Sequence, residues 1–247
     1  MNMKRGQFYI NGKHSSEFNV FMRARPVSAS SGRVIELRER EGNDSIIIDK
    51  AYYKNVERKI DCYYKSPSID DVQEWEDRIT AWLDMGAYSD FIAYYDQQYI
   101  YQAIVTAPPE FKGTRKTGNI VPFEFSVSLR PFKENRLGRI AIPLRSTPFK
   151  IINEQKYTSK PLIKLTGSGD ASFFVNEEEF SLKALDKELI IDSFLEESYR
   201  ALDGKIEHQD HVTAFLDFPE LKPGENTITW SSGIKSFELT PRWRRKV

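Results

Sequence analysis

The sequence predicts a mainly β protein with two sandwich-like domains, of which the first carries one α-helix. Three observations support this fold class. Aromatic residues make up 13% of the 247 residues, with Phe and Tyr the most frequent, and this composition favours strands. Apolar and polar residues alternate in short runs between turn residues, as β-strands require. Only residues 68–86 follow the 3.6-residue period of an amphipathic helix.

Overall composition excludes several classes of protein. Charged residues make up 29% and the formal net charge is zero, so no strong overall field attracts nucleic acid or an anionic membrane. No apolar run approaches the roughly 20 residues that span a bilayer, and the first residues lack the apolar segment of a signal peptide. Cys62 is the only cysteine, so no internal disulfide can form. We therefore expect synthesis in a reducing cytoplasm, no export by the Sec route and no membrane partner.

The first domain is expected over residues 1–132. Its opening strand ends at Asn11-Gly12, the strongest short hairpin signal. Short strands are expected at residues 34–37 and 46–48, with an exposed charged loop between them. A longer strand is expected at residues 56–64, where apolar residues share one face and only Arg58 interrupts them.

The helix is expected to start after an N-cap at Ser68 and to stop at Gly86. Two tryptophans on one apolar stripe indicate that this face is buried against a sheet. The predicted stripe comprises Ile69, Val72, Trp75, Ile79, Trp82 and Leu83.

An aromatic hairpin is expected at residues 91–105, after the helix. The strand predicted at residues 121–129 is expected at a sheet edge, because Pro122 cannot donate to a ladder. Pro131 then marks the end of the first domain.

Residues 133–160 lack periodicity and contain two prolines, which predicts a linker or an extended arm. From Pro161 to residue 247, short strands recur about every ten residues, a spacing typical of a β-sandwich. Near the end, Pro223-Gly224 predicts a turn in which glycine takes a positive φ, and a strand follows at residues 226–230.

Several short motifs follow one another in a fixed order along the chain. Each is common alone, but their order resembles that of the phage distal tail proteins, the Dit family, which are the hub subunits at the tip of long-tailed, non-contractile phages. The motifs are Asn11-Gly12, Trp82-Leu83, Pro131-Phe132, Pro161, Gly167-Ser-Gly169-Asp170, Ile190-Ile-Asp192, Pro223-Gly224 with Asn226, and Trp243-Arg244.

The resemblance implies a structural protein and not an enzyme, with no cofactor. It implies a homo-hexameric ring whose contacts lie in the first domain, with edge strands and the 133–160 arm as contact elements. DNA would only pass through the ring, which would join the major tail tube protein to the tail-tip protein or fibre. Receptor-binding proteins are a further candidate partner. The resemblance also implies a jelly-roll or galectin-like second domain and a location at the virion tail tip, after assembly in the bacterial host cytoplasm.

A carbohydrate-binding β-sandwich module is the alternative function, and a glycoside-cleaving enzyme is a weaker third. Sugar binding requires exposed aromatic side chains on a concave face, whereas alternation places Trp230 inside and Trp243 is also expected to be buried. Adjacent carboxylates at residues 70–71, 177–179 and 196–197 resemble a helix N-terminus and solvated turns more than a glycosidase pair.

Other candidate chemistry in the sequence is weak. His208 and His211 flank a carboxylate, but a structural zinc site normally has four ligands, so a solvated loop is preferred. Cys62 lies on an apolar strand face and is expected to be a buried thiol. Two basic spots, at residues 112–116 and 242–246, fit DNA, subunit contacts or solvent equally well. We therefore expect no catalysis and no required metal.

Overall fold

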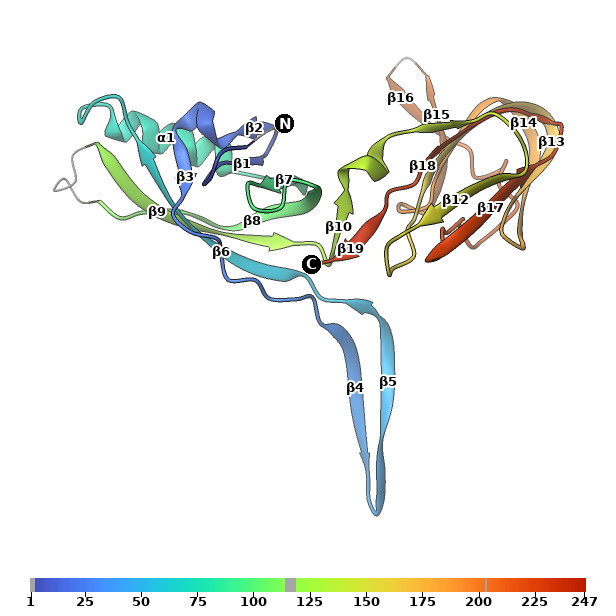
Figure 1. Ribbon diagram of the computed structural model, residues 1–247, viewed down its shortest axis with the longest axis horizontal. Helices are drawn as coiled ribbons and strands as arrows, with labels where there is room; N and C mark the ends of the chain where they lie inside the picture. The colour runs from blue at the N-terminus through green and yellow to red at the C-terminus, as the bar shows by residue number, and fades with distance from the viewer. Residues whose placement is uncertain (1–2, 114–118, 203) are drawn as a thin grey trace. The chain divides into compact units, whose positions relative to one another are not determined.

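The computed structural model describes residues 3–113, 119–202 and 204–247. The chain divides into unit 1, which comprises Met1–Lys133 and Lys246–Val247, and unit 2, which comprises Glu134–Arg245 (Figure 1). The fold class predicted from the sequence is confirmed: antiparallel strands predominate, and α1 (Val72–Leu83) is the one α-helix in the part of the chain that the structure describes. No helix among these residues is long and apolar enough to cross a membrane.

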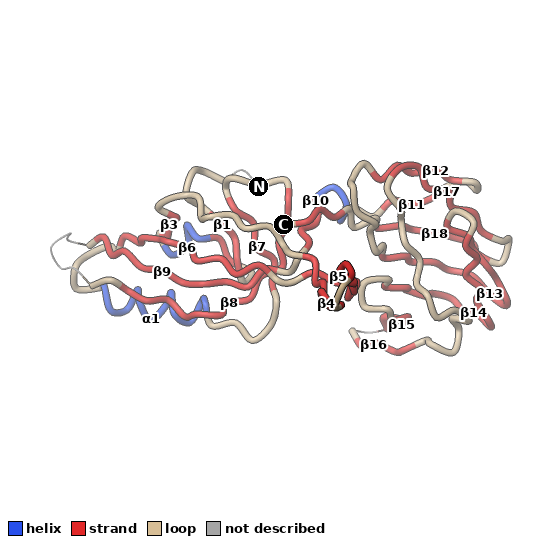
Figure 2. The backbone as a smooth tube through the Cα atoms, turned by 90° about the horizontal axis from the view of Figure 1, so that it is seen from below, coloured by secondary structure: helices blue, strands red, loops and turns tan. Residues whose placement is uncertain are grey.

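Unit 1 is built on an antiparallel sheet with the strand order β2-β1-β7-β8-β9-β6-β3. Its strands are β1 (Phe8–Ile10), β2 (Lys13–His14), β3 (Val20–Met22), β6 (Val56–Lys65), β7 (Ser89–Ala93), β8 (Tyr99–Phe111) and β9 (Ile120–Leu129). β10 (Phe132–Asn135) pairs with β8 and with β19 (Arg244–Lys246) beside this path. The helix α1 lies along the sheet beside β8 and β9 (Figure 2).

The expectation that residues 121–129 form a sheet edge is wrong. β9 pairs with β6 on one side and with β8 on the other, so it lies in the interior of the sheet. Pro122 removes only one donor from the ladder, and its carbonyl oxygen still accepts a hydrogen bond of 2.8 Å from the Lys112 amide.

The core of unit 1 centres on Trp82, which is 4% exposed. Its ring stacks on Phe18 at a centroid distance of 4.3 Å and on Phe8 at 5.6 Å. The indole Nε1 donates a hydrogen bond of 3.0 Å to the carbonyl oxygen of Ile10, so this aromatic side chain is buried with its polar atom satisfied. The predicted helical stripe is confirmed at Trp75, Ile79, Trp82 and Leu83, which are all buried.

The Asn11-Gly12 turn is confirmed and is tied to the helix. Asn11 has φ 49° and Gly12 has φ 74°, and two positive φ values in succession are typical of a tight hairpin turn. Nδ2 of Asn11 donates a hydrogen bond of 2.7 Å to the carbonyl oxygen of Trp82. The backbone amide of Asn11 donates one of 3.0 Å to Ser89 Oγ. The first hairpin and the end of α1 therefore hold each other in place.

The helix begins later than the sequence predicts. Asp71 and not Ser68 is the N-cap residue of α1. Ser68 instead closes the preceding turn, where its Oγ accepts a hydrogen bond from the Asp71 amide at 3.3 Å and donates one to Asp71 Oδ2 at 2.8 Å. Ile69 consequently lies outside the helix and is 53% exposed, so it does not belong to the buried stripe.

A separate two-stranded hairpin interrupts unit 1 between β3 and β6. It consists of β4 (Arg33–Arg40) and β5 (Asn43–Tyr53), and Figure 1 shows it extending away from the sheet. The two short strands predicted at residues 34–37 and 46–48 lie within it. The predicted loop over residues 38–44 is mostly strand, and the turn between the strands contains only Glu41 and Gly42.

Unit 2 is a curled antiparallel sheet in which β17 lies beside the main path β11-β18-β13-β14-β15-β16 and pairs with β12 and β13. Its strands are β11 (Ile142–Leu144), β12 (Phe149–Asn153), β13 (Leu162–Val175), β14 (Glu178–Asp192), β15 (Glu197–Leu202), β16 (Lys205–His208), β17 (Gly224–Trp230) and β18 (Ile234–Thr240). β13 pairs with β18 over its first half and with β17 at its end, so it contributes to both parts of the curl.

The predicted glycine motif lies where β13 bends. A Cβ added to Gly167 would stand 2.3 Å from the carbonyl oxygen of Gly233, so only glycine fits this close approach. Gly169 has φ 75°, and the pairing register shifts beside it. Asp170 Oδ1 accepts a hydrogen bond of 2.9 Å from the Ala184 amide across β14. The motif therefore shapes the sheet.

Residues 133–160, predicted as a linker or extended arm, contain several short elements. They are β10, the 3-10 helix η3 (Arg136–Arg139), β11 and β12. β11 pairs with β18 and β12 pairs with β17, so this segment forms much of unit 2. Strands of three to five residues carry too little alternation to be recognised in the sequence.

We predict that Trp82→Ala lowers the free energy of unfolding of unit 1 by roughly 3–5 kcal/mol, the usual cost of removing a large buried aromatic side chain. Ile69→Ala is the matched control, because Ile69 is 53% exposed and its loss should change stability by less than about 0.5 kcal/mol. Urea unfolding followed by circular dichroism measures both. Equal midpoints for the two variants would contradict the packing described for Trp82.

We predict that a fragment of residues 134–245 folds alone, whereas a fragment of residues 161–247 does not. The shorter fragment lacks β11 and β12, so β18 and β17 each lose the strand that pairs with them on one side, and Leu144, Phe149 and Ile151 no longer pack on the core of unit 2. Gel filtration and near-ultraviolet circular dichroism of the two fragments test this. A folded 161–247 fragment would show that these two strands are dispensable.

Candidate functional site

The predicted motif residue Asp192 is buried in unit 2 and forms an ion pair with Arg242. Asp192 is 4% exposed, and its two oxygens accept hydrogen bonds of 2.6 and 2.9 Å from the guanidinium of Arg242. Oδ1 also accepts from the amides of Phe194, at 3.0 Å, and Leu195, at 3.2 Å. Asp192 therefore joins the end of β14, the loop after it and the segment after β18.

The Trp243-Arg244 motif holds residues 134–160 against the strands of unit 2. The backbone of Trp243 lies so close to η3 that a Cβ on Gly138 would stand 2.5 Å from its nitrogen. Arg244 Nε donates to the carbonyl oxygen of Thr158 at 2.5 Å, and Ser159 Oγ donates to that of Pro241 at 2.8 Å. These contacts fasten the segment after β18 to η3 and to the residues before β13.

The predicted Pro223-Gly224 turn is confirmed, with φ 92° at Gly224. Asn226 is fully buried and closes this turn. Its Oδ1 accepts from the Lys222 amide and its Nδ2 donates to the Lys222 carbonyl oxygen, both at 2.8 Å. Asn226 Oδ1 also accepts a hydrogen bond of 3.0 Å from Asn176 Nδ2, so this buried amide joins the turn to the β13–β14 connection and has a structural role.

The structure does not bring the predicted motif residues into one site. Asn11, Gly12, Trp75, Trp82 and Leu83 belong to the core and first hairpin of unit 1. The carbonyl oxygen of Pro131 accepts a hydrogen bond from the Val247 amide, and that of Pro161 accepts one from the Ser193 amide. Each of these residues shapes the backbone, and none points to chemistry.

The other candidates from the sequence also lack a catalytic arrangement. His208 and His211 are exposed, and no group of three or more His, Cys, Asp or Glu residues that could hold a metal occurs within residues 3–113, 119–202 and 204–247. Cys62 is fully buried, as expected, and burial raises the pKa of its thiol. The predicted basic residues Arg115 and Lys116 lie outside the residues that the structure describes.

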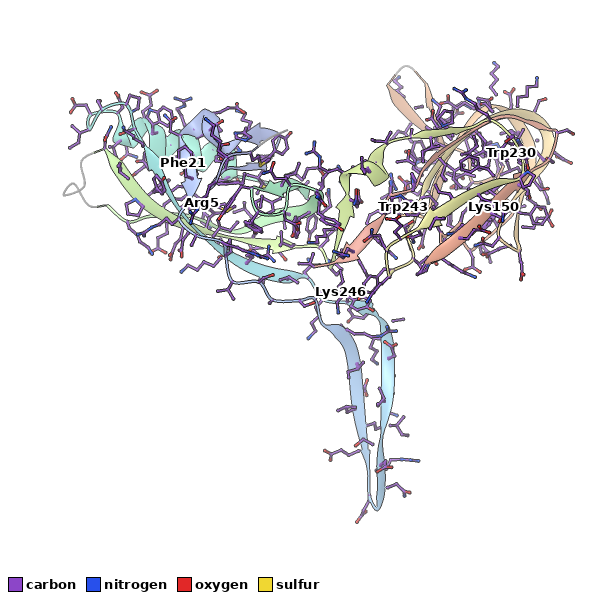
Figure 3. The ribbon with its side chains drawn as sticks, in the orientation of Figure 1. Arg5, Phe21, Lys150, Trp230, Trp243 and Lys246 are labelled. Carbon is purple, nitrogen blue, oxygen red and sulfur yellow. The ribbon has the colours of Figure 1, made fainter. Side chains whose placement is uncertain are left out.

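The β4–β5 hairpin exposes a stripe of aliphatic side chains. Leu37 lies directly opposite Ile47, and Ile35 lies two residues along on the same face of the ribbon. These three side chains are 60%, 67% and 50% exposed, respectively. Figure 3 shows the side chains of the hairpin standing away from the ribbon on both sides. An isolated two-stranded ribbon is marginally stable in water, and an exposed apolar stripe of this kind is typical of a surface that binds another protein.

Charged residues occupy much of the other face of the hairpin. Glu36 pairs with Lys50 at 2.8 Å and with Arg38 at 3.4 Å. Asp49 lies directly opposite Ile35, on the aliphatic face, where the guanidinium of Arg33 donates to its carboxylate and lowers the pKa of that carboxyl. All these ion pairs are exposed and contribute little to stability, so the hairpin is not held by them alone.

Aromatic contacts anchor the hairpin at its base. The ring of Tyr53 meets Phe132 edge-on at a centroid distance of 5.3 Å, and Lys246 Nζ lies 5.5 Å from the centroid of Tyr53. The hairpin is therefore fixed at its base and free at its tip. The sequence offered one signal of this surface: three successive isoleucines, at residues 46–48, cannot all lie on one face of a strand.

Comparisons with known proteins support the fold. The sequence matches no protein-family model and no curated protein. Its structure is similar to the crystal structure of phage SPP1 Dit (gp 19.1), described as a paradigm of the hub adsorption apparatus in Gram-positive infecting phages, with a TM-score of 0.74 and 10% identity over 98% of both chains. It is also similar to a chain of the phage P2 baseplate in its activated conformation with Ca, with a TM-score of 0.53 and 8% identity over 99% of both chains. The Sr form of this baseplate gives 0.54, with 8% identity over 98% of both chains.

We predict that Arg242→Met destabilises unit 2 by about 3–5 kcal/mol, because it leaves the Asp192 carboxylate buried without its cation. Adding Asp192→Asn should recover part of that loss. Lys150→Met is the matched control: it removes an ion pair with Glu225 in which both side chains are more than half exposed, and it should cost about 1 kcal/mol or less. Thermal unfolding of the three variants measures these differences, and an Arg242→Met variant as stable as the control would contradict the assigned role.

Proposed function

We propose that this chain is a structural hub subunit of a phage tail and that six copies close a ring at the distal end of that tail. The observation that carries this proposal is the likeness of the whole chain, with both units, to a phage hub protein at a TM-score of 0.74. The baseplate chains give further support, because they have the same fold over nearly the full length.

Ring closure needs a repeated contact between different surfaces of neighbouring copies. The sequence suggested edge strands and the 133–160 segment for this contact. Residues 121–129, the strand singled out for the edge, lie inside the sheet, and β11 and β12 already pair within unit 2. The exposed face of the β4–β5 hairpin, defined by Ile35, Leu37 and Ile47, takes their place in the proposal. A second copy that covers this face removes it from water.

The proposed ring joins the major tail tube protein on one side to the tail-tip protein or fibre on the other, and receptor-binding proteins are further partners. DNA only passes through its opening. The protein then acts by geometry at the virion tail tip, after assembly in the host cytoplasm, and performs no catalysis. The hub and baseplate proteins among its structural neighbours support this role. The motif residues also support it, because several of them are buried in the cores of the two units and they do not gather at one site.

The alternative function, carbohydrate binding by the second unit through aromatic stacking, is not favoured by any observation. Trp230 and Trp243 are partly buried and pack against the core of unit 2, and the ring of Trp230 lies 5.3 Å from that of Phe237 (Figure 3). These two rings therefore do not form an exposed stacking platform.

We predict a hexamer, or a multiple of one, in light scattering at micromolar concentration, and a ring with a central hole in negative-stain electron microscopy. Leu37→Asp with Ile47→Asp should yield folded monomers, because two carboxylates on the apolar face oppose its burial. Ile206→Asp is the matched control, since Ile206 is 64% exposed on β16 in unit 2 and should leave the ring intact.

Circular dichroism must show that the hairpin variant keeps its strands. A wild-type protein that stays monomeric under all salt conditions would count against the ring. A hairpin variant that still forms hexamers would place the subunit contact elsewhere.

A further inference from the structure

We propose that an acidic groove in unit 2 binds a positively charged segment of a partner protein, with a lysine or arginine side chain in the groove and apolar neighbours on its rim. The groove lies between the loop after β14 and the segment before β17. It has a volume of about 320 Å³. Its lining residues are Lys160, Glu178, Ser193, Glu196, Leu216, Asp217, Phe218, Glu220 and Lys222.

The zero net charge of the chain conceals a strong local asymmetry. Residues 177–225 contain fourteen acidic and five basic residues, so this segment carries a formal charge of −9 and the remaining residues carry +9. A surface with one sign of charge attracts partners of the opposite sign and accelerates their association. The groove is formed mainly by this segment.

Within the groove, carboxylates outnumber their cations. Lys160 Nζ pairs with Glu196 at 2.6 Å, and this bond lowers the pKa of the Glu196 carboxyl. In the part of the chain that the structure describes, the carboxylates of Glu178, Asp217 and Glu220 form no ion pair, and the ammonium of Lys222 forms none either. Three unpaired carboxylates beside one free ammonium leave room for a further cation.

A polar group on the wall of the groove also lacks a partner. Ser193 is fully buried, and its Oγ forms no hydrogen bond with the residues that the structure describes. A buried hydroxyl without a partner is unfavourable, because it has lost water and gained nothing in return. Ser193 is also one of the residues that line the groove.

The rim of the groove is apolar, which indicates a protein segment and not a free cation. Leu216 is 95% exposed. Phe194, which is 42% exposed, and Leu195, which is 55% exposed, lie in the loop between the lining residues Ser193 and Glu196. A small cation gains nothing from these side chains, whereas a peptide can place its own apolar residues on them.

A second groove, of about 560 Å³, continues the same surface and shares Glu178 and Lys222 with the first. It adds Glu177 and Glu225 to its walls. Glu225 is paired with Lys150 at 2.8 Å, while the carboxylate of Glu177 forms no ion pair with any residue that the structure describes. The acidic surface therefore continues over two adjoining grooves and disfavours DNA or any anionic polymer.

Methyl NMR spectroscopy of the full-length protein tests the proposal, with Leu195 and Leu216 as reporters on the rim. The probe is the synthetic peptide acetyl-Gly-Leu-Arg-Leu-Gly-amide, with Leu-Glu-Leu and Ser-Arg-Ser peptides as matched controls. We expect the Leu-Arg-Leu peptide to shift both methyl groups with millimolar affinity. The Glu178→Lys/Glu220→Lys variant should bind about tenfold more weakly. Glu154→Lys/Glu207→Lys, which has the same net charge and two exposed acids outside the groove, should bind like wild type.

No shift at about 10 mM peptide, equal binding by the groove variant, or equal binding of Leu-Glu-Leu would each overturn the proposal. Equal binding of Ser-Arg-Ser would overturn the apolar part of it. Chitotriose is the saccharide probe, and methyl shifts with chitotriose alone would assign the groove to sugars instead. Methyl shifts that grow with protein concentration in the absence of peptide would assign it to self-association. Light scattering on the same samples reports ring closure separately, so the two proposals can fail independently.

Discussion

The buried carboxylate of Asp192 is the interaction on which unit 2 depends most. It accepts two hydrogen bonds from Arg242 and two from backbone amides, so one side chain satisfies groups from three segments of the chain. Arg242 in turn positions the Trp243-Arg244 segment, which holds the residues before β13. Because a charge buried without its partner is costly, these segments must come together in one arrangement.

Helices and strands are predicted best from the sequence where their apolar residues recur several times at a regular spacing. The helix with Trp75 and Trp82 and the alternating strand at residues 121–129 have buried faces that the structure reproduces. Turn chemistry is equally local: Asn11-Gly12 and Gly224 adopt the positive φ values that their residue types permit. In each case, the information lies within a few neighbouring residues.

Other features depend on partners that are distant in the sequence. β11 and β12 are too short to show an alternation of apolar and polar residues. Each is a strand only because it pairs with a distant one, β11 with β18 and β12 with β17. Pro122 suggested an edge, although one missing donor does not prevent pairing on both sides. The three consecutive isoleucines at residues 46–48 predict an ordinary strand, whereas they belong to a separate two-stranded sheet, β4–β5. The zero net charge of the whole chain conceals the excess of acidic residues in residues 177–225.

Unit 2 begins at Glu134 and ends at Arg245, and both neighbouring stretches of chain belong to unit 1. Topologically it is an insertion near the C-terminus of unit 1, because the last two residues return to the first unit. An inserted unit of this kind can vary independently. Its loops and surface charge can change while β10 and β19, through which the chain enters and leaves it, stay the same. Substitutions in unit 2 can then change its surface without altering the sheet and core of unit 1.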